Sequence, residues 1–178
     1  MEFSEQKKDV NVWKANLKNG LIMAAIGIGY TIIINLFNLT FTKAQTYILY
    51  LIQMVVLFFM LKGYRDKYKG GYITYGESVG AGAVIFLIYA AIMAAFMYVL
   101  YKFIDPSLLD ESLAYAEEML VERGVPQETI DTAMEMQESM MTPGFIAISG
   151  IFTYFLYGLV FSLVDSIFVK NTKNPVLE

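Results

Sequence analysis

Four long apolar segments, separated by shorter charged ones, dominate the pattern of the chain. Residues 20–39 contain no charged side chain, and as a helix they would extend about 30 Å, the thickness of the hydrocarbon layer of a bilayer. The other apolar segments are residues 46–62, 78–101 and 145–169. Residues 46–62 form the shortest of the four, and we expect Lys62 to reach the headgroups from the end of this segment. The pattern therefore predicts four membrane-spanning helices.

Residues 102–144 have a different pattern, in which mostly apolar residues recur every three or four positions and so fall on one face of a helix. This spacing is typical of amphipathic helices. Asp105 and Pro106 predict the start of a first helix, and Gly124 predicts its end. The stripe positions are Leu109, Leu113, Ala116 and Leu120 in the first helix and Ile130, Ala133, Met134, Gln137 and Met141 in the second. We expect a helical hairpin that packs over the ends of the spans, with its two stripes against each other or against the membrane surface.

These patterns predict one fold class: an all-α integral membrane protein with four transmembrane helices and an extracytoplasmic amphipathic helical hairpin between spans three and four. The chain is expected to form a single membrane domain. Its order is a cytoplasmic N-terminus (1–19), span one (20–39), span two (46–62), a basic cytoplasmic loop (63–77), span three (78–101), the acidic hairpin (102–144), span four (145–169) and a cytoplasmic tail (170–178).

The distribution of Lys and Arg predicts the orientation, because basic residues resist translocation across the membrane. The N-terminal segment has four of the 13 basic residues, residues 62–77 have four and the tail has two. Three others, Lys43, Lys102 and Arg123, lie in the alternate connections. We therefore expect both termini and the basic loop in the cytoplasm, and the hairpin on the other side of the membrane.

Composition supports the membrane class and limits the chemistry. Hydrophobic residues make up 57% of the 178 residues, above the roughly half that is usual in soluble domains. The chain has no Cys and no His, so it lacks thiol nucleophiles, disulfides, imidazole bases and the usual zinc ligands. We expect no enzyme activity, no cofactor and no metal, and the net charge of −4 gives no reason to expect nucleic acid as a partner.

Asp165 and Glu77 are the two carboxylates closest to the apolar segments. Asp165 lies within residues 145–169, near their cytoplasmic end, and ionisable groups in spans suggest a function in ion or proton handling. A structural ion pair is the favoured alternative, and Lys18, Lys62 and Arg65 are its candidate partners. Glu77 precedes span three, where we expect it to cap the helix.

Amides and small residues mark candidate contacts between spans. Asn35 and Gln53 could form a hydrogen bond between spans one and two, or bind a solute. Gly76 and Gly80 form a GxxxG motif in span three, and Gly158, Ser162 and Ser166 repeat small residues in span four. Small residues let helices approach closely, and we favour packing within the bundle over a dimer contact for these rows.

The central and outer motifs also resemble those of a known family. The chain reads GYRDKYKGGYITYGESVGAG from Gly63 to Gly82, and YR...G.ITYGE from Tyr64 to Glu77 is its most specific pattern. The outer segment opens with IDPSLLDE and continues through VERGVPQETID. With the four spans, these motifs resemble the bacterial membrane-protein family named domain of unknown function 4199. The resemblance covers nearly the whole chain and implies the fold and a bacterial inner-membrane location, but no activity.

Two classes of function follow from these observations. We favour a non-enzymatic structural or interaction subunit of the inner membrane, because the chain has no catalytic constellation and has two strongly charged faces. Its partners would be the lipid bilayer and other membrane or periplasmic proteins. The alternative is a small ion or solute channel or transporter, in which Asn35, Gln53, Glu77 and Asp165 share a cavity in an oligomer. The sequence leaves the oligomeric state open.

Overall fold

The computed structural model describes residues 11–40 and 42–172, and this part of the chain is almost wholly helical. Four of its helices are long and apolar enough to cross a membrane, which confirms the predicted all-α class. In chain order the elements are α1 (Val12–Leu36), α2 (Lys43–Tyr68), α3 (Tyr75–Val99), the short π-helix η1 (Leu100–Ile104), α4 (Ser107–Glu122), α5 (Gln127–Met140) and α6 (Pro143–Val169). The four long apolar helices are α1, α2, α3 with η1, and α6.

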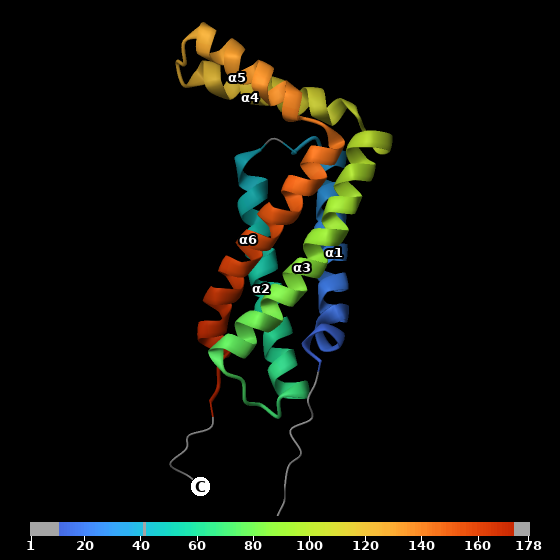
Figure 1. The fold of residues 1–178 in the computed structure, drawn as a ribbon, viewed down its shortest axis with the longest axis vertical. Coiled ribbons are helices and arrows are strands. Elements are labelled where there is room, and N and C mark those ends of the chain that lie inside the picture. Colours follow the sequence, from blue (N-terminus) through green and yellow to red (C-terminus); the bar gives the residue numbers. More distant parts are fainter. Residues whose placement is uncertain (1–10, 41, 173–178) are drawn as a thin grey trace, which may run out of the picture.

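The four long helices form an elongated bundle (Figure 1). Helices α1 and α3 run in one direction, and α2 and α6 run in the other. The loop between α2 and α3 lies at the end of the bundle where α1 begins and α6 ends. Helices α4 and α5 lie beyond the opposite end, above the turn between α1 and α2. The basic and the acidic parts of the chain are therefore at opposite ends of the molecule.

The outside of the bundle is apolar. Leu36 of α1, Phe59 of α2 and Phe152 and Phe168 of α6 are all exposed, and 70% of the surface of Phe168 is accessible. Exposing apolar surface to water costs about 25 cal/mol per Å². Hydrocarbon removes this cost, so the exterior suits a bilayer and would be unfavourable in water.

Helix α3 is the centre of the packing, because α6 and α1 both pack along it. Tyr89 and Phe86 of α3 are fully buried, together with Met23 of α1 and Leu57 and Leu61 of α2. Small residues let α3 and α6 approach closely, because a Cβ added at Gly82 or Gly158 would overlap the facing side chain. The facing pairs, one helical turn apart, are Ser78 with Ser166, Gly82 with Ser162 and Phe86 with Gly158.

Helix α2 is longer than the span predicted at residues 46–62, since it continues to Tyr68. The first part of the predicted basic loop, residues 63–77, is therefore helical, and Arg65 and Lys67 lie in its last turns. Arg and Lys favour helices, so the chain leaves the helix only near Gly70 and Gly71, whose φ angles are 63° and 85°. Helix α1 likewise begins at Val12, inside the predicted N-terminal segment 1–19.

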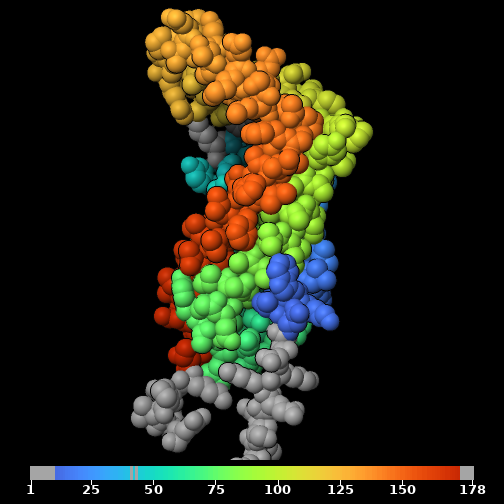
Figure 2. Space-filling model, in the orientation of Figure 1, coloured from blue at the N-terminus to red at the C-terminus, as the bar shows by residue number. Residues whose placement is uncertain are grey.

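Helices α4 and α5 pack against each other and form the predicted hairpin. Gly124 ends α4 as expected: its φ is 70°, its N–H donates to the Val121 carbonyl at 2.9 Å, and the Val125 N–H donates to the Leu120 carbonyl at 3.2 Å. Helix α4 begins at Ser107, just after Pro106. The hairpin contacts the bundle mainly through η1, and Figure 2 shows that it projects beyond the ends of the spans.

Candidate functional site

Asp165 is a buried carboxylate one helical turn before the end of α6. Only 4% of its surface is exposed, and its Oδ2 atom has no hydrogen-bond partner. Burying an ionised carboxylate without a partner is costly in protein and in lipid. The position of Asp165 is therefore not explained by packing alone.

The predicted ion pairs of Asp165 with Lys18, Lys62 or Arg65 are not formed. Arg65 pairs with the exposed Asp66, with 2.7 Å between Nε and Oδ1, and its Nη1 donates to the Val169 carbonyl at 3.1 Å. Lys18 and Lys62 are exposed. The prediction relied on similar depth along the bundle, but α6 is rotated so that Asp165 is buried, while Lys18 and Lys62 are exposed and Arg65 is bonded to other groups.

Serine hydroxyls lie on α6 on both sides of Asp165. Ser166 follows it and donates to the Ser78 hydroxyl of α3 at 2.8 Å. Ser162 lies one turn earlier and donates to the Gly158 carbonyl at 2.7 Å. All three serines are fully buried. Among the residues that the structure describes, no three His, Cys, Asp or Glu side chains cluster as metal ligands.

Gln53 is a second buried polar group without a partner. Neither atom of its amide forms a hydrogen bond, although the amide lies near the hydroxyls of Tyr89 and Tyr157, which are 3.2 Å apart. The predicted hydrogen bond between Gln53 and Asn35 is absent. Asn35 lies in the last turn of α1, whereas Gln53 lies well inside α2, so the two are separated by roughly 15 Å along the bundle.

Glu77 caps α3, as predicted. Its Oε2 atom accepts a hydrogen bond from the Thr74 N–H at 3.0 Å, and the Thr74 hydroxyl accepts one from the Glu77 N–H at 3.3 Å. This reciprocal arrangement is a capping box. The ammonium of Lys69 lies 2.8 Å from Oε1. Glu77 is therefore held at the exposed end of α3 and does not share a site with Asp165.

The loop between α2 and α3 is joined to the segment that follows α6. Ile73 and Asn171 exchange two backbone hydrogen bonds of 2.8 and 3.0 Å, and the Asn171 side chain donates to the Gly71 carbonyl at 2.9 Å. We call these contacts, together with that of Arg65 with Val169, the inner latch. The motif from Tyr64 to Glu77 supplies most of the inner latch and the cap of α3, so its residues have a structural role.

The two rows of small residues behave differently. Gly158 and Ser162 lie in the contact between α6 and α3, as predicted. The packing predicted for Gly76 and Gly80 is wrong, because both are exposed and a Cβ added to either would meet no atom within 4 Å. Two residues correspond to about 200° around a helix, so Ser78 and Gly82 point to α6 while Gly76 and Gly80 point away.

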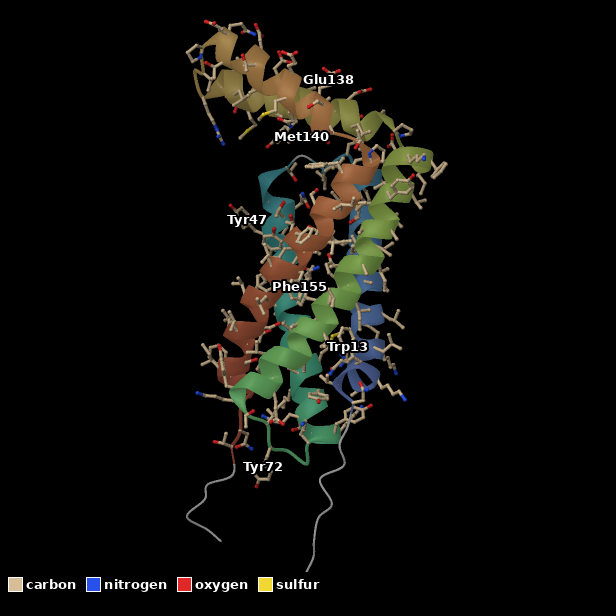
Figure 3. All side chains as sticks on the ribbon, in the orientation of Figure 1. Trp13, Tyr47, Tyr72, Glu138, Met140 and Phe155 are labelled. Atoms are coloured by element: carbon tan, nitrogen blue, oxygen red, sulfur yellow. The ribbon has the colours of Figure 1, made fainter. Side chains whose placement is uncertain are left out.

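The hairpin has an acidic outer face and an apolar inner face. Figure 3 shows Glu138 on the side away from the spans and Met140 on the side toward them. An open groove of about 590 Å³ lies between this inner face and the first turns of α6. Its apolar lining includes Met119, Leu120, Met136, Met140, Phe145 and Ile146, and Arg123 also lines it.

Sequence reasoning missed three features of these sites. The contact of Tyr89 with Tyr157, the hydrogen bond of Ser78 with Ser166 and the position of Arg123 in the groove all depend on which helices are neighbours. One signal was present for the serines, because small residues recur every fourth position in both Ser78–Gly82 and Gly158–Ser166.

Four apolar helices with an apolar exterior and a few buried polar groups define a multi-pass helical membrane protein. The family model described as "Protein of unknown function (DUF4199)" matches residues 18–171, which is most of the chain. The chain therefore belongs to this family, and the resemblance of its motifs is confirmed. Comparison with curated proteins and with solved structures finds no match.

Proposed function

We propose that this protein is a non-enzymatic interaction subunit of the bacterial inner membrane, and that the outer face of its hairpin binds a partner outside the cytoplasm. One observation carries the proposal. Residues 102–144 contain ten carboxylates on an element that projects beyond the bundle (Figure 2), and within the described chain none of them forms an ion pair.

The buried residues of the hairpin are apolar, namely Leu108 of α4 and Ile130 of α5. Helices α4 and α5 pack through apolar positions, and close like charges weaken a helix pair rather than stabilise it. A partner with a basic surface would offset this repulsion and would be steered toward the hairpin. The partner class that fits is therefore a membrane or periplasmic protein with exposed Lys and Arg.

The inner latch supports a structural role for the opposite end of the molecule. Arg65, Ile73, Thr74 and Glu77 of the central motif all make contacts that fix the loop or cap α3. These four residues of the motif are therefore engaged in holding the loop and the start of α3. A fixed bundle that carries a projecting arm is the arrangement that an adaptor needs.

The test is isolation of the tagged protein from its native membranes in mild detergent. We expect a basic protein to co-purify and to dissociate as the salt rises from about 0.05 M to about 0.5 M, where the screening length falls severalfold. Replacing Glu117, Glu118, Glu128 and Glu135 by Gln should release it. A control with the neutral, exposed Thr129 and Thr132 replaced by Gln should retain it. A protein that comes alone, or a partner that ignores the charge change, would contradict the proposal.

A second candidate function is ion or solute translocation by an oligomer of this chain. It is favoured by Asp165 and Gln53, which are buried within the bundle with polar atoms that lack partners. In proteoliposomes, this function requires ion flux that Asp165→Asn abolishes and that Asp66→Asn, at an exposed carboxylate of α2, leaves intact. Equal permeability of vesicles with and without the protein would end this candidate.

A further inference from the structure

Charge is unevenly divided between the groove under the hairpin and the rest of residues 102–144. This segment contains ten carboxylates and two basic residues, Lys102 and Arg123. None of the ten carboxylates lines the groove, whereas Arg123 does, and among the residues that the structure describes it is the only charged one in the lining. The groove therefore combines an apolar wall with a single cation.

The groove is continuous with the surface that faces lipid. Phe145, Ile146 and Ser149 of its lining belong to the first turns of α6, and the exposed side of this helix continues with Ile148 and Phe152. An acyl chain can therefore extend from the bilayer into the groove along these apolar side chains of α6. The volume of about 590 Å³ lies within the range of roughly 300–1,000 Å³ that small-molecule sites occupy.

Arg123 is placed to bind a headgroup. It follows the last residue of α4, its side chain is exposed, and in the part of the chain that the structure describes it takes part in no ion pair. A guanidinium group binds a phosphate through two parallel hydrogen bonds. The carboxylates of the hairpin do not line the groove, so they do not neutralise this cation from within the site.

We propose that this groove is a binding site for one anionic phospholipid, with an acyl chain along Met119, Met136 and Met140 and the headgroup phosphate at Arg123. Methionine suits such a wall because its flexible, polarisable side chain adapts to a chain of variable shape. The site does not depend on the proposed binding of a protein partner, which uses the opposite, acidic face of the hairpin. The bound lipid would hold the hairpin close to the bilayer surface.

Native mass spectrometry of the full chain, purified in detergent and titrated with phosphatidylglycerol, tests the proposal. We expect one lipid to bind per chain before any further lipids. Arg123→Gln should weaken this first binding event about fivefold, because a basic residue near a membrane contributes about 1 kcal/mol toward anionic lipid. Lys102→Gln removes the same charge outside the groove and should leave the affinity unchanged. Equal effects of the two substitutions on lipid affinity would contradict the proposal that the headgroup binds at Arg123.

The apolar wall is tested by a second matched pair. Met136 lines the groove and Val121 does not, although 62% and 56% of their surfaces are exposed. Met136→Gln should weaken the first binding event, and Val121→Gln should not. Displacement of the lipid by inorganic phosphate alone, or no effect of Met136→Gln, would show headgroup binding without a chain site. A disulfide between two copies of a Met136→Cys variant would show that a second copy occupies the groove. Each of these three results contradicts the proposal.

Discussion

At the scale of single residues, Asp165 and Glu77 show how position decides what a carboxylate does. Both lie near the same end of the bundle, yet the Glu77 carboxylate accepts three hydrogen bonds, from Lys69 and Thr74, whereas the Oδ2 atom of the buried Asp165 accepts none. A satisfied carboxylate stabilises the start of a helix, and an unsatisfied one in the bundle reduces stability. The cost at Asp165 makes it the residue to test.

We predict that Asp165→Asn raises the free energy of unfolding by about 1 to 3 kcal/mol at pH 8, because it removes an ionisable group whose charge is costly to bury. At this pH the folded protein must either bury the charge or take up a proton, and Asn requires neither. The difference should shrink at acidic pH, where the carboxyl group is protonated in both states. Reversible unfolding in mixed micelles measures it.

The control for this prediction is Asp66→Asn. Asp66 is exposed and pairs with its neighbour Arg65, so the substitution should change the free energy of unfolding by less than about 1 kcal/mol. If Asp165→Asn instead destabilises the protein by about 3 to 5 kcal/mol, Asp165 has an ion-pair partner and its description as unpaired is wrong.

At the scale of helices, the contact between α3 and α6 depends on small residues in one register. Gly82 and Gly158 each face a side chain of the other helix. One turn further along, the Ser166 hydroxyl of α6 donates a hydrogen bond to the Ser78 hydroxyl of α3. In lipid, no hydrophobic force brings the helices together, so close packing and hydrogen bonds supply the association energy. The register is therefore sensitive to a single added methyl group.

We predict that Gly158→Ala destabilises the bundle by about 1 to 3 kcal/mol, because the added Cβ overlaps Phe86 and forces the helices apart. Gly80→Ala is the matched control on α3, where the Cβ would meet no atom within 4 Å. It should be neutral or stabilising by up to about 1 kcal/mol, since Ala favours helices more than Gly does. Thermal unfolding in detergent compares them, and an equal loss in both variants would indicate that Gly80 also lies in a contact, for example between copies.

At the scale of the whole molecule, the alternating directions of four helices separate the basic and acidic regions. The loop between α2 and α3 lies at one end with the start of α1 and the end of α6, and the hairpin lies at the other (Figure 1). Since basic residues resist translocation, the proposed orientation keeps the loop in the cytoplasm and exports the hairpin.

We predict that single thiols at Lys67→Cys and Glu128→Cys react from opposite sides of the membrane. Both positions are exposed, and the chain has no Cys of its own, so each variant carries one thiol. A membrane-impermeant thiol reagent added to intact cells stripped of the outer membrane should label Glu128→Cys alone, and inverted vesicles should give the reverse. Labelling of both variants from one side would contradict the arrangement of four spans.

Several features of the fold and site were predictable because they are local. The apolar runs predicted four long helices, Gly124 predicted the end of α4, and the sequence Thr74 to Glu77 contained the capping box. Each depends on residues within a few positions of one another. The amide pair Asn35 and Gln53 was mispredicted because it assumed that two polar residues in neighbouring spans meet, whereas they lie at different depths.

By itself, the sequence determined the class of protein, the number of long helices and the division of charge, because transfer of apolar residues into lipid depends on composition and length. The tertiary structure decided which faces meet. Asp165 is buried and not paired with Lys18, Lys62 or Arg65, and Gly82 rather than Gly80 contacts α6. Arg123 is the only charged residue, of those the structure describes, that lines the groove. The reason is that the rotation of each helix about its axis is set by its neighbours, and in a chain apolar on most faces the pattern of residues does not specify that rotation.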